Sequence, residues 1–283
     1  MKEHDRKRSG GRARPFLWKV PIFAAFLFAT IVVAWPEEKV SLASGYVEVP
    51  RFGIQAGFSL SYLGARDDSL VPLLHGGPRL AISPAFQVAI GAGSLRLEGN
   101  FGLAYLQDRY GDEGIAADWD ASASYWLAPA GTGLSPGLSL GWDNDIVLFA
   151  DWDDVHAYWI GYRWIGPSLA VKRGLGGGWN LELRGSLAVA GLASRPPAYQ
   201  SSKQEATRRV SFYFETPNRE PFFSWIGETQ LVRASFEVYR PGASTSANSW
   251  TLGGELRFAR ASLPLPAYSL EASLRAAYSW RWR

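Results

Sequence analysis

Apolar and polar side chains alternate with a period of two along most of the chain after residue 50. From Phe52 to Tyr62 every even position is apolar, whereas the odd positions hold Gly, Gln or Ser. The same alternation recurs in 95–105, 115–125, 179–189, 250–258 and 268–282. A period of two places successive side chains on opposite faces of a β-strand. No comparable stretch shows a helical period, so the sequence predicts an all-β chain.

Gly-rich and polar segments divide this region into strands. Residues 91–93 and 174–178 are rich in Gly and predict tight turns, whereas 64–77, 191–207 and 240–248 predict longer connections. The predicted strands are 52–63, 79–90, 95–106, 115–127, 136–150, 156–172, 178–190, 207–216, 222–239, 249–260 and 267–282. The regions 136–172 and 222–239 each leave one strand in doubt. Because a closed antiparallel barrel with both chain ends on one side needs an even number, we expect roughly 10–12 strands.

The two faces of these strands separate a membrane barrel from a soluble β-protein. One face carries unbroken runs of Leu, Val, Phe, Tyr and Trp, and the other mixes charge with Ser, Gly and Ala. Small residues beside charge suit a hydrated lumen, and apolar faces that end in aromatics suit lipid. We therefore expect outward-pointing side chains at Leu97, Leu103, Leu181, Leu252 and Leu274. Inward-pointing leucines would instead indicate a soluble secreted β-barrel with an apolar ligand cavity.

The final strand shows this pattern most clearly. Its apolar face consists of Tyr268, Leu270, Ala272, Leu274, Ala276, Tyr278, Trp280 and Trp282, and its polar face of Ser269, Glu271, Ser273, Arg275, Ser279 and Arg281. The strand resembles the C-terminal signature of bacterial outer-membrane β-barrel proteins, although Arg283 follows the last aromatic residue. The resemblance implies an antiparallel transmembrane barrel in the outer membrane of a Gram-negative-type bacterium. It also implies two partners, the lipid bilayer and the barrel-assembly machinery, which would read this strand.

The first 43 residues have the pattern of a secretory signal peptide. A stretch rich in Lys and Arg ends at Lys19, the run from Val20 to Trp35 is uncharged, and Ser41 and Ala43 are small residues at the spacing that signal peptidase accepts. The run is close to the lower limit for a membrane-spanning helix, roughly 17–25 residues, so an uncleaved anchor is the alternative. We expect 1–43 to be the signal peptide and 44–283 to form the barrel.

Composition narrows the classes of function. The chain has 283 residues and no Cys, which excludes disulfides and Cys-based chemistry. Its formal charge is +3, but 8 of the 29 Lys and Arg residues lie in the first 43 residues, against 4 of the 26 acidic residues. The basic character therefore belongs to the leader, and a nucleic-acid partner is not expected. The 13 Trp residues fit aromatic belts at the two membrane interfaces.

Charge is segregated along the barrel region. From Glu98 to Asp154 there are eleven acidic residues and one base, and from Val155 onward there are sixteen Lys or Arg and eight Glu. Early and late strands of a closed barrel face each other across the lumen, so opposite charges should meet there. The expected lumen charges are Asp118, Asp120, Glu182, Arg184, Glu255, Arg257, Glu271 and Arg275. Asp118 and Asp120 would oppose Arg184, Arg257 and Arg275. In a barrel of roughly 10–12 strands these residues either line a narrow channel or pair and plug it.

An Asp-rich segment is the strongest candidate for a metal site. Its carboxylates are Asp143, Asp145, Asp151, Asp153 and Asp154, followed by His156. Hard oxygen ligands in such a cluster suit Ca²⁺. The spacing does not fit an EF-hand loop, so a solvated hairpin tip is the alternative. No other cofactor is indicated.

Catalysis has weaker support in the sequence. Residues 133–137 match the G-x-S-x-G pattern, but a nucleophile elbow needs a helix after Ser135, and none is predicted. We interpret this segment as a turn. After the leader only His75 and His156 remain, so a serine–histidine enzyme would use one of them. The leading interpretation is a structural or narrow-channel barrel without catalysis. The alternative is a lipid-acting hydrolase centred near His156, with or without Ca²⁺.

Overall fold

The computed structural model describes residues 52–67, 71–127, 133–151, 154–195, 221–240, 248–263 and 266–282. The chain divides into two units, Met1–Gly45 and Tyr46–Arg283, and every described residue belongs to the second. The predicted signal peptide and the strand predicted at 207–216 lie outside the described residues. None of the described residues forms a helix that is long and apolar enough to cross a membrane.

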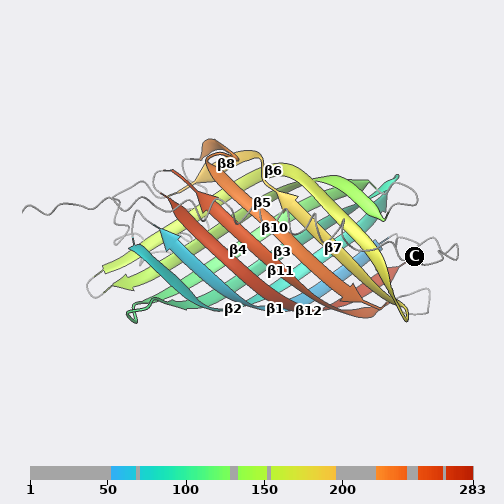
Figure 1. The fold of residues 1–283 in the computed structure, drawn as a ribbon, viewed down its shortest axis with the longest axis horizontal. Coiled ribbons are helices and arrows are strands. Elements are labelled where there is room, and N and C mark those ends of the chain that lie inside the picture. Colours follow the sequence, from blue (N-terminus) through green and yellow to red (C-terminus); the bar gives the residue numbers. More distant parts are fainter. Residues whose placement is uncertain are drawn as a thin grey trace, which may run out of the picture. The chain divides into compact units, whose positions relative to one another are not determined.

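The described residues fold into an antiparallel β-barrel (Figure 1). Its strands are β1 (Phe52–Asp67), β2 (Val71–Ile90), β3 (Gly93–Gln107), β4 (Glu113–Leu127), β5 (Leu134–Asp151), β6 (Asp154–Gly176), β7 (Trp179–Leu187), β8 (Ala190–Ser194), β9 (Phe222–Trp225), β10 (Thr229–Tyr239), β11 (Ser249–Ala261) and β12 (Ala267–Trp282). Strands β1–β7 and β10–β12 form a closed ring of 10 strands, in which β12 pairs with β1. The predicted antiparallel barrel is confirmed, and its ring of 10 strands is the lower end of the predicted range.

Strands β8 and β9 are not members of this ring. They lie between β7 and β10 along the chain, and both of those strands belong to the ring. β8 follows β7 and pairs with β6, and β9 pairs with β8 and precedes β10. Backbone hydrogen bonds stabilise the short connections between β7 and β8 and between β9 and β10. Val189 N donates to Ile165 O at 3.0 Å, and Ile226 N donates to Val189 O at 2.8 Å. The region 222–239, where the sequence left one strand in doubt, therefore holds two strands, because a turn separates β9 from β10.

Two predicted connections are also wrong. The segment 64–77 is not a long loop, because β1 continues to Asp67 and β2 begins at Val71. Its Gly residues allow close strand approach instead: a Cβ on Gly77 would overlap the backbone of Tyr105 on the neighbouring β3. The turn predicted at 133–137 is mostly strand, since β5 begins at Leu134 and pairs with β6 there.

The barrel has two distinguishable ends. At the end called here the terminal end, Phe52 pairs with Trp282, and the 91–92 turn joins β2 to β3. The opposite end, called the far end, carries the 108–112 turn between β3 and β4 and the β11–β12 connection. The ambiguous region 136–172 forms β5 and β6, strands of 18 and 23 residues that also meet at the far end.

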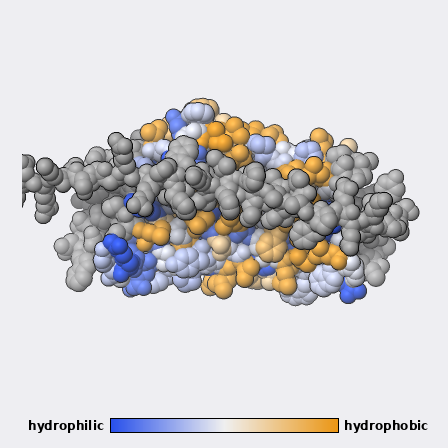
Figure 2. Space-filling model, viewed as in Figure 1, coloured by the Kyte–Doolittle hydropathy of each residue, from blue (hydrophilic) through white to orange (hydrophobic). Residues whose placement is uncertain are grey.

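Side-chain burial in this barrel is inverted relative to a soluble protein. Leu252 and Leu274 are 62% and 70% exposed, Leu97 and Leu103 are exposed, and Leu181 is partly exposed. The alternate positions are polar and buried, as their burial patterns show. Hydrophobic side chains form several patches on the part of the barrel wall that is coloured in Figure 2. The five leucines therefore point outward as expected, which contradicts a soluble barrel with an apolar cavity.

Aromatic side chains gather on the outer wall near both ends. At the terminal end Tyr278 contacts Trp250 and Trp280, with ring centroids 5.2 and 4.9 Å apart. Tyr62 is exposed ten positions along β1 from Phe52. At the tilt typical of such strands that separation spans roughly 25 Å, the height of the apolar band of an outer-membrane barrel.

The lipid-facing wall generates the first prediction. Leu274 lies in the middle of β12, so Leu274→Arg should lower the free energy of unfolding in phospholipid vesicles by about 2–4 kcal/mol. Leu74→Arg, at an equally exposed site near the far end, should cost about 0–1 kcal/mol. Urea titration of the two variants measures the difference. Equal costs at both positions would contradict a lipid-facing wall.

Candidate functional site

Charged side chains fill the lumen because they occupy those alternate positions of their strands that point inward. They form two groups. The terminal-side cluster consists of Arg96, Glu98, Lys172, Glu182, Arg184, Glu237 and Arg275. The far-side cluster consists of Arg79, Asp118, Asp120, Asp143, Asp145, Arg233, Arg257 and Glu271.

Glu237 on β10 is the centre of the terminal-side cluster. Its Oε1 accepts hydrogen bonds from Arg96 and Arg275 at 3.0 Å each, and it also pairs with Arg184. Gln55 on β1 accepts from the same two Arg side chains at 2.8 Å. One carboxylate and one amide therefore connect β1, β3, β7, β10 and β12 across the lumen.

Glu98 and Glu182 extend this cluster. Glu98 accepts from Arg96 at 2.6 Å and from Arg184 at 2.8 Å. Glu182 lies 3.8 Å from Arg184 and 3.5 Å from Lys172. Each guanidinium is shared by at least two acceptors, so the network holds its side chains in fixed positions.

Arg79 on β2 is the centre of the far-side cluster and is only 1% exposed. Its Nε donates to Asp118 Oδ2 at 2.5 Å and its Nη1 donates to Glu271 Oε1 at 2.7 Å, while its Nη2 also pairs with Asp118. The guanidinium reaches across β3 because Gly102 has no side chain there, and a Cβ on Gly102 would overlap it.

The other two bases of the far-side cluster come from β10 and β11, near the end of the chain. Arg233 on β10 donates to Asp120 at 2.9 Å and also pairs with Asp143. Arg257 on β11 lies 3.2 Å from Asp143 and 3.0 Å from Asp145. The carboxylates are on β4 and β5, so the charges segregated along the sequence meet across the lumen.

The structure places all eight charges expected in the lumen at inward positions, but their pairing differs from the expectation. Asp118 pairs with Arg79 and Asp120 with Arg233. Of the three bases expected opposite them, Arg257 lies in the same cluster, whereas Arg184 and Arg275 do not. The reason is that these two arginines lie at a different height along the barrel axis from Asp118 and Asp120. Arg184 and Arg275 lie in the terminal-side cluster, where they meet Glu237.

Several residues of the network were missing from the expected site. These are Arg79, Arg96, Glu98, Arg233 and Glu237. The alternation of polar and apolar residues could have identified them. In β10, for example, Arg233 and Glu237 share one face with Ser235, and Val232, Ala234 and Phe236 occupy the other. The expectation that the Trp residues lie in aromatic belts is wrong for Trp164, which is buried and points inward, where its Nε1 donates to Asp143 Oδ2 at 2.5 Å. Tyr162 is buried on the same face of β6.

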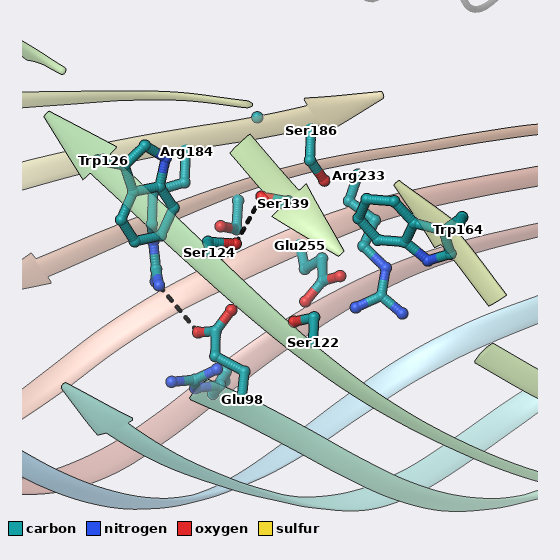
Figure 3. A pocket seen from close by; sticks show the side chains of 13 residues that line it. Glu98, Ser122, Ser124, Trp126, Ser139, Trp164, Arg184, Ser186, Arg233 and Glu255 are labelled. Atoms are coloured by element: carbon teal, nitrogen blue, oxygen red, sulfur yellow. Dashed lines mark hydrogen bonds and ion pairs between the residues drawn. The ribbon is translucent and has the colours of Figure 1, made fainter. Parts of the chain in front are cut away.

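A small polar chamber lies between the two clusters (Figure 3). Its serine hydroxyls come from four strands, at Ser122, Ser124, Ser139, Ser186 and Ser235. The Glu255 carboxyl group also faces the chamber. The cavity measures about 40 Å³, which is room for about three water molecules.

An apolar layer closes the lumen beyond the far-side cluster. It consists of Leu63, Ala65, Ala104, Leu106, Ala116, Val147, Ile160, Ala261 and Ala267, all buried. We call this layer the apolar cap. Its members come from seven strands, at the far-end side of the charged residues on the same strands. Four cavities among the described residues measure about 40, 30, 10 and 10 Å³, and side chains of the two clusters and of the apolar cap occupy the lumen around them.

His75 and Asp108 lie near the cap at the far end. His75 is buried in β2, and Asp108 begins the 108–112 turn. Asp108 Oδ1 accepts from Tyr110 N at 2.7 Å and from Asp112 N at 2.9 Å. Desolvation alone would raise the pKa of the Asp108 carboxyl, but these N–H donors and His75 outweigh it, and the pKa is lowered.

The Asp-rich segment is only partly described. Asp143 and Asp145 face the lumen and contact Arg257. Asp153 and the side chains of Asp151, Asp154 and His156 lie outside the description. No three His, Asp or Glu side chains within the described ranges are arranged to hold a metal ion.

Solved structures with a similar architecture are outer-membrane barrels. The translocator domain of autotransporter NalP from Neisseria meningitidis has a TM-score of 0.46 at 11% identity, covering 93% of this chain and 98% of that chain. The outer membrane protease OmpT from Escherichia coli gives 0.43 at 10%, covering 83% and 99%. The β domain of the Bordetella autotransporter BrkA gives 0.39 at 14%, covering 81% and 99%. At these TM-scores and identities the likeness says nothing of the role of this chain.

No family model and no curated protein matches the sequence. The class follows from the structure itself. A closed ring leaves no unpaired strand edge to face hydrocarbon, and exposed leucines between two aromatic belts require a lipid surrounding. The fold is therefore that of a transmembrane β-barrel, and the lipid bilayer is its environment.

The Arg79 contacts generate the second prediction. Arg79→Met leaves Asp118 and Glu271 buried without their base, so the free energy of unfolding in vesicles should fall by about 3–5 kcal/mol. The triple variant Arg79→Met, Asp118→Leu, Glu271→Leu should recover most of that loss, because no unpaired charge remains. Urea titration measures both variants. Equal destabilisation of the single and triple variants would contradict the role given to the ion pairs.

Proposed function

We propose that this protein is a structural outer-membrane barrel whose lumen does not conduct. The supporting observation is that charged clusters and the apolar cap lie in series along the lumen. A solute would have to separate Arg–carboxylate pairs that join opposite walls, such as Arg233–Asp120. Removing one partner from a buried pair costs several kcal/mol, so these contacts form a stable barrier.

The apolar cap adds a second barrier of a different kind. Leu106, Val147 and Ile160 offer no polar atom to replace the water around a passing ion. Hydrophobic constrictions of this kind exclude ions by dewetting. The narrow-channel alternative would need both barriers to move, and the charged lumen is better explained as a plug.

The role of the closed barrel is that of an anchor. A membrane-spanning strand needs about 9–11 residues, whereas β5 and β6 have 18 and 23. Their excess length lies toward the far end, where β8 and β9 also extend the wall. With the terminal end in the periplasm, as the class implies, the barrel would hold these hairpins outside the cell. Assembly through recognition of β12 belongs to the same proposal.

Planar-bilayer recording tests the absence of conductance. The folded protein should give no conductance steps, while a general porin reconstituted in parallel should give them. Heat-modifiable migration on a gel shows that the protein under test is folded. Reproducible steps from the folded protein would contradict the proposal and favour the narrow channel.

A further inference from the structure

Two arginine side chains interrupt the apolar outer wall near the far end. Arg66 on β1 is exposed, and its neighbour Ala65 is buried in the apolar cap, so Arg66 points outward. Arg260 on β11 lies between Ala259 and Ala261, which are both buried. Alternation along the strand therefore places Arg260 on the outer wall as well.

Strand register brings these two arginines to either side of one aromatic residue. Tyr268 on β12 is the register partner of both Arg66 and Arg260, and β1, β12 and β11 are neighbours in the ring (Figure 1). The Arg260 guanidinium lies over the Tyr268 ring, 5.8 Å from its centroid. The Cα atoms of the two arginines are two strand spacings apart, about 10 Å, so their long side chains can meet on one anion. We call Arg66, Tyr268 and Arg260 the basic patch.

The basic patch lies at the edge of the apolar band. Arg66 is four residues closer to the far end than Tyr62, and Tyr268 is two residues beyond Leu270 in the same direction. On the terminal side of the patch the wall is apolar and exposed, at Leu60, Tyr62, Leu256 and Leu270. Lipid headgroups lie at this level and acyl chains lie along the wall.

The described carboxylates of these three strands are on the opposite face. Glu255 lines the polar chamber, and Glu271 pairs with Arg79 in the lumen. The described outer side chains of β1, β11 and β12 therefore include two guanidiniums and no carboxylate. Basic side chains at headgroup level attract anionic lipids, and a guanidinium binds phosphate oxygens in a bidentate manner.

We propose that the basic patch binds the phosphate monoester headgroup of a membrane lipid. Arg66 and Arg260 donate hydrogen bonds to the phosphate oxygens, and the Tyr268 ring holds the Arg260 guanidinium through its π face. The acyl chains continue along the apolar wall past Leu270. A phosphate monoester carries up to two negative charges, which two guanidiniums balance. The site uses the lipid-facing wall and does not depend on whether the lumen conducts.

Native mass spectrometry tests this site on full-length folded protein released from lipid nanodiscs. With equal amounts of phosphatidic acid and phosphatidylcholine that have the same acyl chains, the protein should preferentially retain one phosphatidic acid molecule. Phosphatidylglycerol, a phosphodiester with a single charge, should be retained less than phosphatidic acid. Excess inorganic phosphate should not displace the lipid, because it lacks the acyl chains that lie on the wall.

Variants of the two arginines test which residues bind the lipid. Arg66→Gln and Arg260→Gln should each lower the preference for phosphatidic acid about fivefold, and the double variant should lower it further. Arg173→Gln is the matched control, because it removes the same charge from the outer face of β6 near the terminal end. It should retain phosphatidic acid like the unaltered protein. Heat-modifiable migration shows folding, and if the double variant does not fold, exposed Arg66 is tested alone.

Three results would overturn the site. The first is equal retention of phosphatidic acid and either of the other two lipids. The second is an unchanged preference in Arg66→Gln, or an equal loss in Arg173→Gln. The third is displacement by inorganic phosphate, which would indicate a soluble phosphate ligand instead. None of these measurements involves conductance, so their failure is distinguishable from a failure of the proposed anchor.

Discussion

The pairing of guanidinium and carboxylate groups across the lumen is the interaction on which this structure depends. Lipid surrounds the wall, so the inner face is favoured for charged side chains of the spanning segments, and the interior is too narrow to leave them in bulk water. Arg79, Arg233 and Arg257 meet carboxylates from other strands of the ring. The barrel is therefore held by its backbone hydrogen bonds around the circumference and by ion pairs across the middle.

These ion pairs also fix the register of the strands. A shift of one residue between neighbouring strands exchanges their inner and outer faces. In β12 such a shift would turn Glu271 and Arg275 into lipid and Leu274 into the charged lumen. A buried pair adds little net stability compared with apolar groups of the same shape, but the wrong arrangement is very costly. The polar interior thus serves to specify one arrangement of the ring.

The sequence predicted the fold because period-two alternation depends only on which face is wet, and it predicted the inward charges for the same reason. It did not predict which charges pair. Asp118 meets Arg79 because Gly102 opens a path across β3, and neither the strand heights nor that gap can be read from alternation. The inward aromatics were missed for a related reason: Trp164 has the parity of the lumen, but its neighbours resemble an interfacial belt. The break between β9 and β10 likewise depends on pairing with β8.

Site-directed spin labelling along β12 is the most direct measurement, since a chain without Cys gives no background label. Labels at 270, 272, 274 and 276 should be accessible to oxygen, which concentrates in lipid. Labels at 269, 271 and 273 should be shielded both from oxygen and from a water-soluble nickel chelate. That period-two pattern is the result expected of a lipid-facing wall around a closed lumen. Strong nickel accessibility at 269–273 would show a water-filled pore and contradict the account.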